Sequence, residues 1–178
     1  MQDKVMEAFL KKQFEDGMAL ARASDLLELE PLLALGTPPR LYKATYRCKG
    51  LVRLDSGEIV EADEFEAFVF FPDGYPRSVD PRRVVRWSGP MNVWHPNIKP
   101  PDICIGHMPP GTELTAILRQ IHGIITYNNY MPREDDALNH AACQWARQNK
   151  HRLPVDKRPL VGKAHEFRVR MIDREASP

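Results

Sequence analysis

The sequence predicts an α+β fold with an N-terminal helix, an antiparallel four-stranded meander, a stiff loop and C-terminal helices. Apolar residues first recur at a helical period, then alternate approximately as in strands, and return to a helical period after the loop. Tight turn signals separate the strand-like runs. Such turns join antiparallel strands, whereas parallel strands need long crossovers. We therefore expect helices packed on one face of an antiparallel sheet.

Residues 1–40 are expected to form a helical N-terminal region. Over 3–22, apolar residues recur every four positions, as on one face of an amphipathic helix. A second apolar stretch, 26–35, ends at Gly36-Thr37-Pro38-Pro39, which is typical of a helix stop followed by a turn. The stripe of the first helix consists of Met6, Leu10, Phe14 and Met18.

The sheet is expected between residues 41 and 87. Two runs, 41–53 and 58–71, contain β-branched and aromatic residues with approximate alternation, and the turn signal Asp55-Ser56-Gly57 separates them. A shorter strand is expected over 83–87. Consecutive strands joined in this way form an antiparallel meander.

Proline is frequent over residues 91–111, where no periodicity is visible. Because proline fixes φ and removes a hydrogen-bond donor, we expect a stiff loop here, and long loops of this kind are often functional. A helix is expected over 112–126, with Thr112 as its N-cap. A last helix carries Leu138, Ala141, Ala142 and Trp145.

Composition excludes several classes of protein. The chain of 178 residues is 43% hydrophobic and 28% charged, which excludes both a disordered chain and a membrane span, and its net charge of +1 gives no strong attraction to nucleic acid. The charged N-terminus lacks the apolar core of a secretory signal, and three widely spaced cysteines indicate reduced thiols. We therefore expect a cytoplasmic protein with no membrane and no nucleic-acid partner.

Cys104 is the candidate reactive residue because it lies inside the stiff loop. Cys48 and Cys143 are interpreted as small buried hydrophobic residues, since the first falls in a predicted strand and the second on the last predicted helix. A cysteine in a loop is weak evidence by itself, so the motifs around it decide its interpretation.

Four motifs follow one another in a specific order. They are Phe71-Pro72-x-x-Tyr75-Pro76, His95-Pro96-Asn97, Ile103-Cys104-Ile105 and Pro-x-x-Asp-Asp-x-Leu-Asn-x-x-Ala over 132–142, with the predicted helix 112–126 before the last. The arrangement resembles the ubiquitin-conjugating enzyme family over residues 41–152, the expected catalytic core. Its divergence resembles a prokaryotic branch found beside bacterial ubiquitin-like genes, often in antiviral operons.

The resemblance implies a two-step acyl transfer. Cys104 would accept the C-terminal glycine of a ubiquitin-like protein from an activating enzyme as a thioester, and the acyl group would then pass to a lysine amine of a target. Asn97 matches an asparagine that either donates to the developing oxyanion or braces the cysteine loop. Asp136, or its neighbour Asp135, matches an acidic residue that orients the lysine and lowers its pKa.

The resemblance also implies supporting residues and partners. His95, Pro96 and Tyr75 are expected to hold the active-site loop and not to react. No cofactor and no metal are implied. The expected partners are a ubiquitin-like protein, an activating enzyme and a substrate lysine. A ligase is an optional further partner, because Pro109-Pro110-Gly111-Thr112 replaces the Trp-Ser/Thr-Pro of the usual ligase platform.

The main alternative is a catalytically inactive adaptor that binds a ubiquitin-like protein or an activating enzyme, although such relatives lack the cysteine. Residues 153–178 are interpreted as a C-terminal extension of the same single domain. Within them, 165–172 alternates and would suit an added strand or a partner-binding tail.

Two other enzyme or metal sites can be drawn from the sequence. A zinc site would combine Cys104 and His107 with His95 or His122, but structural zinc usually has a second compact ligand pair. A papain-like hydrolase would use Cys104 with His140 and Asn139, but adjacent helical residues point about 100° apart.

Overall fold

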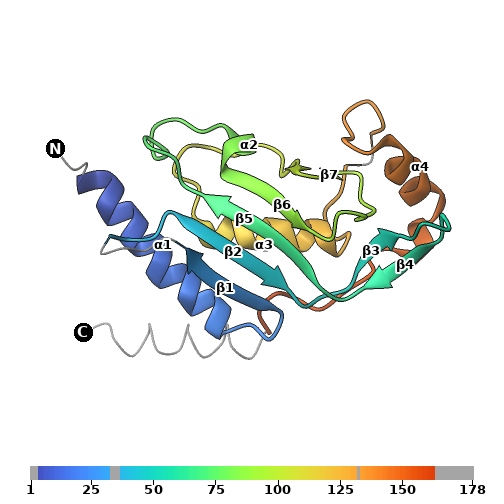
Figure 1. Ribbon diagram of the computed structural model, residues 1–178, viewed down its shortest axis with the longest axis horizontal. Helices are drawn as coiled ribbons and strands as arrows, with labels where there is room; N and C mark the ends of the chain where they lie inside the picture. The colour runs from blue at the N-terminus through green and yellow to red at the C-terminus, as the bar shows by residue number, and fades with distance from the viewer. Residues whose placement is uncertain (1–3, 33–36, 132, 163–178) are drawn as a thin grey trace.

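A computed structural model describes residues 4–32, 37–131 and 133–162 of the chain (Figure 1). The structure is α+β: an N-terminal helix precedes a four-stranded antiparallel sheet, and further helices follow, as the sequence predicts. The elements in chain order are α1 (Lys4–Arg22), β1 (Leu27–Leu32), β2 (Leu41–Tyr46), β3 (Gly50–Arg53), β4 (Ile59–Ala62), β5 (Phe65–Phe70), α2 (Pro81–Val84), β6 (Val85–Gly89), β7 (Ile98–Lys99), β8 (Asp102–Ile103), α3 (Leu114–Ile125), α4 (His140–Gln148) and a 3₁₀ turn (Lys150–Arg152).

The first strand corrects the sequence prediction. The sheet has the order β1-β2-β5-β6, and β1 pairs with β2 along its whole length, from Leu27 opposite Tyr46 to Leu32 opposite Leu41. The expectation of a helix over 26–35 is therefore wrong for 27–32, while 33–36 lie outside the described residues. Buried Leu27 and Leu29 alternate with exposed Glu28 and Glu30, a pattern that fits a strand with one buried face. The segment is compatible with either a helix or a strand, and pairing with β2 stabilises the strand.

Each of the two long predicted strands bends into two. β2 and β5 pair in the sheet, whereas their continuations β3 and β4 pair with each other as a separate hairpin. The turn at Asp55-Ser56-Gly57 is confirmed, and Gly57 takes a left-handed φ of 89°, which glycine adopts at no steric cost. At the bend, Gly50 leaves room for the Phe65 ring, because a Cβ there would lie 2.6 Å from Phe65 Cζ.

The next strand begins later than predicted. Asp80 caps the short helix α2 by accepting a hydrogen bond from the Arg82 N–H at 3.1 Å, and Pro81 occupies the first turn of the helix. β6 therefore starts at Val85 and pairs with β5.

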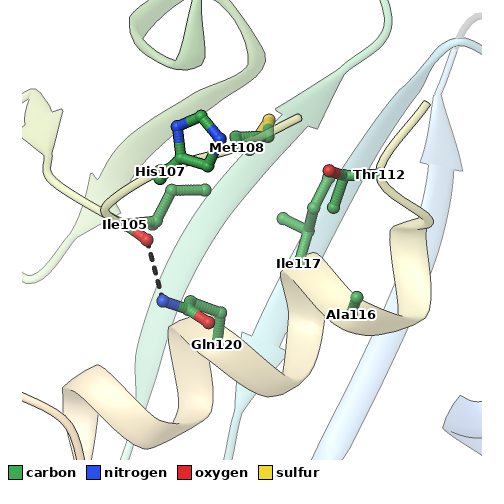
Figure 2. A pocket seen from close by; sticks show the side chains of 7 residues that line it. All are labelled: Ile105, His107, Met108, Thr112, Ala116, Ile117 and Gln120. Atoms are coloured by element: carbon green, nitrogen blue, oxygen red, sulfur yellow. Dashed lines mark hydrogen bonds between the residues drawn. The ribbon is translucent and has the colours of Figure 1, made fainter. Parts of the chain in front are cut away.

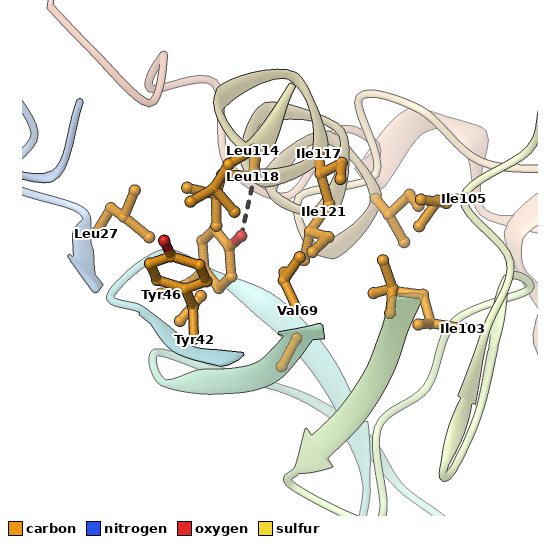
Figure 3. Close-up of a cluster of buried hydrophobic side chains, with 14 of the residues drawn as sticks. Leu27, Tyr42, Tyr46, Val69, Ile103, Ile105, Leu114, Ile117, Leu118 and Ile121 are labelled. Carbon is orange, nitrogen blue, oxygen red and sulfur yellow. Dashed lines mark hydrogen bonds between the residues drawn. The ribbon is translucent and has the colours of Figure 1, made fainter. Parts of the chain in front are cut away.

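The core lies between the sheet and α3. Leu114, Leu118 and Ile121 of α3 face the buried residues Tyr42, Tyr46 and Val69 of the sheet (Figure 3). The Tyr46 hydroxyl donates to the Leu118 carbonyl at 3.1 Å, which satisfies its buried hydroxyl.

Helix α1 packs against α3 and β1. One of its side chains accepts a hydrogen bond from the first turn of α3, where the sequence predicts a cap by Thr112. Thr112 is not the N-cap. Glu113 occupies that position without a side-chain bond, and Gln13 of α1 instead accepts from the Leu114 N–H at 2.7 Å. The buried face of α1 recurs at a helical period, as Met6, Leu10, Gln13, Gly17 and Leu20.

The last described residues pack against the rest of the domain through hydrogen bonds. Val155 N–H donates to the Thr126 carbonyl at 3.0 Å, and the Ser24 hydroxyl donates to the Leu160 carbonyl. The segment 165–172 lies outside the described residues. Within the described part of the chain, no helix combines the length and apolar character that crossing a bilayer requires.

Candidate active site

The stiff loop contains a small hairpin that presents Cys104. Its two arms are β7 and β8, which pair through Ile98–Ile103 and Lys99–Asp102, so the segment is not wholly aperiodic. The loop is fixed from both sides, because Trp94 N–H donates to the Leu51 carbonyl at 2.8 Å and Trp87 N–H to the Pro101 carbonyl at 2.9 Å. The chain leaves this hairpin directly into Cys104.

Cys104 differs from the other two cysteines in exposure. Ile103 and Ile105 point into the core beside α3 (Figure 3), whereas Cys104 between them is partly exposed, as alternation along an extended segment requires. Cys48 and Cys143 are fully buried, as the sequence predicts. Burial raises the pKa of Cys48 to about 12 and also raises the pKa of Cys143. All three cysteines are described, so Cys104 carries the accessible thiol.

Asn97 braces Cys104 through main-chain atoms. The Cys104 N–H donates to the Asn97 carbonyl at 2.8 Å, and the Asn97 side-chain amide donates from Nδ2 to the Cys104 carbonyl at 3.0 Å. Asn97 Oδ1 accepts from the Met131 N–H at 2.7 Å. The asparagine side chain therefore joins the cysteine segment to the chain that follows α3.

His95 and Pro96 orient Asn97. His95 Nδ1 accepts from the Asn97 N–H at 3.0 Å, and the His95 ring packs on Tyr127 with centroids 4.2 Å apart. Desolvation of this buried ring lowers the pKa of His95 to about 3, so it is neutral near pH 7 and Nδ1 can accept. The Pro96 carbonyl accepts from the Asn139 N–H at 3.1 Å.

Tyr75 holds the far end of the loop. Its hydroxyl donates to the Thr112 carbonyl at 2.8 Å, and its ring packs edge-on against Phe71 with centroids 4.8 Å apart. Burial raises the pKa of Tyr75 to about 12, although the bond to Thr112 opposes the rise. The residue therefore packs and donates.

Asp136 lies on the segment that Asn97 and Pro96 hold in place. The bonds at Met131 and Asn139 lie on either side of it. Its carboxylate is exposed, with an oxygen 3.9 Å from the Arg133 guanidinium, and Asp135 is exposed as well. A carboxylate in this position is accessible to an incoming cation.

Gln120 also binds the cysteine segment, although no sequence motif predicts it. Its side-chain amide donates from Nε2 to the Ile105 carbonyl at 2.8 Å, beside a small cavity of about 60 Å³ (Figure 2). The available signal was a polar residue beside the apolar stripe of α3, between Ile117 and Ile121. The cavity is lined by Ile105, His107, Met108, Thr112, Ala116, Ile117 and Gln120.

The alternative sites gain no support from the geometry. Within the described residues, no three or more His, Cys, Asp or Glu side chains are grouped so that they could hold a metal ion. Asn139 Oδ1 accepts from the Ala142 N–H as the N-cap of α4, and His140 Nδ1 lies 2.6 Å from the Glu134 carbonyl oxygen. These two residues are therefore engaged at the start of α4 and are not paired with a thiol.

In comparisons with known proteins, neither a protein family nor a curated protein sequence matches this chain.

Proposed function

We propose that this chain is a ubiquitin-conjugating-like enzyme that carries the C-terminus of a ubiquitin-like protein as a thioester on Cys104 and transfers it to a lysine amine. The observation that carries the proposal is the contrast among the thiols: Cys104 is accessible on a braced segment, while Cys48 and Cys143 are sealed in the interior. The order of helix, antiparallel sheet, cysteine loop and helices supports a fold of the ubiquitin-conjugating type.

The first step needs only an accessible thiolate. The Cys104 sulfur attacks the carbonyl carbon of the thioester on the activating enzyme, a new C–S bond forms, and the donor cysteine leaves as a thiolate. The bond that breaks resembles the bond that forms, so the reaction is close to balanced. A cysteine is intrinsically nucleophilic even when only a small fraction is ionised, so no strong base is required.

The second step needs a positioned amine and a stabilised oxyanion. The lysine nitrogen attacks the thioester carbonyl and a C–N bond forms. The proton of the nitrogen passes to solvent water, the C–S bond breaks, and Cys104 leaves as a thiolate. Asn97 has two amide hydrogens, and one is bonded to the Cys104 carbonyl. The other remains to donate to the oxyanion, so bracing and stabilisation are compatible in one side chain. Asp136 would attract the lysine and orient it.

The proposal includes a cytoplasmic location. A catalytic thiol that must remain reduced between cycles suits the cytoplasm, where disulfides are rare. The proposed partners are a ubiquitin-like protein, an activating enzyme and a protein lysine, and a role in bacterial antiviral defence is part of the same proposal.

The proposal is tested by incubating the purified chain with ATP, a candidate activating enzyme and a candidate ubiquitin-like protein. The expected result is an ATP-dependent band shift that disappears on treatment with a thiol. A shift that is equally strong in Cys104→Ser, or no shift with an activating enzyme that charges itself, contradicts the proposal. Binding of the ubiquitin-like protein without any shift would favour the adaptor alternative.

A further inference from the structure

The segment that carries Cys104 is held along both of its edges. In an extended chain, the N–H and C=O groups of successive residues point to opposite edges. Both main-chain polar groups of Cys104 face Asn97, at 2.8 Å for the N–H and 3.0 Å for the carbonyl. The carbonyl of the next residue, Ile105, faces α3, where it accepts from Gln120 Nε2 at 2.8 Å (Figure 2). One amide side chain therefore secures each edge.

The Gln120 contact is close to the sulfur and rests on a rigid element. Ile117 and Ile121, on either side of Gln120 along α3, are buried in the core. Beyond Ile105 the loop contains glycines at positive φ, Gly106 at 78° and Gly111 at 77°, before the tie between Tyr75 and Thr112. Because glycine restricts the backbone little, a loop with two such residues depends on side-chain ties to keep its shape.

We infer that Gln120 is a positioning residue that holds the Cys104 sulfur in register with Asn97, an inference that rests on the proposed function. Gln120 touches neither the thiol nor the acyl group; it acts through the Ile105 carbonyl. Loss of the bond frees the α3 edge of the segment, so that the thioester carbonyl loses its orientation toward the Asn97 amide and the incoming amine. Misplacement of reacting groups by about 1 Å can cost 10²-fold in rate.

The test uses the full chain and a chemical acyl donor, so it needs no partner protein. A synthetic peptide that ends in glycine and carries a C-terminal thioester acylates Cys104: the sulfur forms a new C–S bond and the small donor thiol leaves. Free lysine is then added, its amine forms an amide with the peptide, and Cys104 is released as the thiol. Single-turnover rates over a range of lysine concentrations separate the limiting rate from the half-saturating concentration.

Four variants isolate the donor. Gln120→Leu is similar in volume but cannot donate, Gln120→Glu is isosteric but accepts only, and Gln120→Lys restores a donor on a flexible chain. Arg119→Gln is the matched control, an exposed neighbour on the same helix. We expect the limiting rate to fall about 10- to 100-fold in the first two variants with an unchanged half-saturating lysine concentration. The lysine variant is expected to stay within about threefold of the original chain, and the control to be unaffected.

Alkylation by iodoacetamide separates positioning from loss of structure. This small reagent needs only an accessible sulfur, so its rate on Cys104 should change by less than about threefold in every variant. Discharge rates that are equal in all variants, or alkylation that falls in parallel with discharge, overturn the role of Gln120. A wild-type chain that is alkylated but never acylated overturns the proposed function and this role with it.

Discussion

Asn97 is the residue on which most of the site depends. Its side chain donates to the Cys104 carbonyl and accepts from the Met131 N–H, so one amide joins two residues that are 27 positions apart along the chain. Burial makes these bonds costly to lose, because an unsatisfied buried polar group costs about 1–3 kcal/mol. These bonds give Asn97 a structural role that is separate from its proposed role in the reaction.

Replacing Asn97 tests both roles. Asn97→Ala removes both bonds, so we expect the free energy of unfolding to fall by about 1–3 kcal/mol and both acylation of Cys104 and discharge to lysine to slow. Asn97→Asp keeps the acceptor for Met131 but loses the donor, so we expect a discharge rate about 10²–10³-fold lower. Urea unfolding and single-turnover discharge check these results. An alanine variant with full stability and unchanged rates would disprove the bracing role.

Asp136 is predicted to act on the incoming amine. An exposed carboxylate attracts the lysine ammonium, but its benefit is smaller when free amine is plentiful, because a lysine amine has a pKa of about 10.4. Asp136→Asn should therefore slow discharge to lysine more at pH 7 than at pH 9.5. Asp55→Asn, at an exposed aspartate in the turn between β3 and β4, is the control and should leave the rate unchanged. A defect of equal size at both pH values would argue against a role in lowering the lysine pKa.

His95 predicts a loss of stability in acid. Burial holds its pKa in the folded chain near 3, below the value of about 6.5 in the unfolded chain, so the unfolded chain takes up the proton first as the pH falls. The stabilisation is complete above about pH 6.5 and is lost as the pH decreases toward 3. As the pH falls from 7 to 5, the preference of the unfolded chain for the His95 proton should lower the free energy of unfolding by about 2 kcal/mol.

The variant His95→Asn isolates this effect, because an asparagine oxygen can replace Nδ1 as the acceptor for the Asn97 N–H without titrating in this range. Urea unfolding at the two pH values should show a smaller decrease for the variant than for the original chain. His122, whose pKa burial also lowers, remains in both proteins and is common to the comparison. An equal decrease in the two proteins would refute the assignment to His95.

At the scale of elements, the strands were less predictable than the helices. The alternation of leucine and glutamate over 27–30 fits a strand, yet both residue types are good helix formers, so sequence alone favoured the wrong element. Pairing with β2 decides the outcome, and that is a contact between distant parts of the chain. The bends that divide β2 from β3 and β4 from β5 depend in the same way on tertiary packing around Gly50.

Gly50 is predicted to tolerate no side chain. A Cβ would lie 2.6 Å from Phe65 Cζ and 3.0 Å from Ile125 Cγ2, and a buried aromatic ring moves aside poorly. Gly50→Ala should therefore lower the free energy of unfolding by about 1–3 kcal/mol. Gly123→Ala in α3 is the control, since its nearest contact is at 3.6 Å, and it should be neutral or stabilising by up to about 1 kcal/mol. Urea unfolding measures both, and equal stabilities would contradict the account of the bend.

At the scale of the whole molecule, the C-terminal segment completes the domain. The buried Asp156 carboxylate accepts from the Lys49 N–H at 2.9 Å and binds the Arg158 guanidinium at 2.6 Å, and the Asp156 carbonyl accepts from Asn128. These bonds lower the pKa of Asp156 although burial opposes them. The segment thereby ties the bend after β2 to the end of α3, which leads into the chain that Asn97 holds.

The part of the site that could be predicted from the sequence is the part with characteristic side chains. Cys104, Asn97 and His95 carry side-chain identities that form a motif, and the structure brings them into one bonded unit. Gln120 and Met131 also hold this region, but each bond involves a main-chain group. Gln120 donates to the Ile105 carbonyl, and Met131 donates its own N–H to Asn97. Main-chain groups are present at every residue, so such contacts leave almost no mark on the sequence.

The most direct test of the central claim, that Cys104 is the acyl-carrying thiol, is peptide mapping by mass spectrometry after charging with ATP, activating enzyme and ubiquitin-like protein. We expect the C-terminal glycine on Cys104 in the original chain and in Cys48→Ser and Cys143→Ser. In Cys104→Ser we expect no thiol-labile adduct, with at most a slowly hydrolysed ester. A thiol-labile adduct of undiminished yield in Cys104→Ser would contradict the claim.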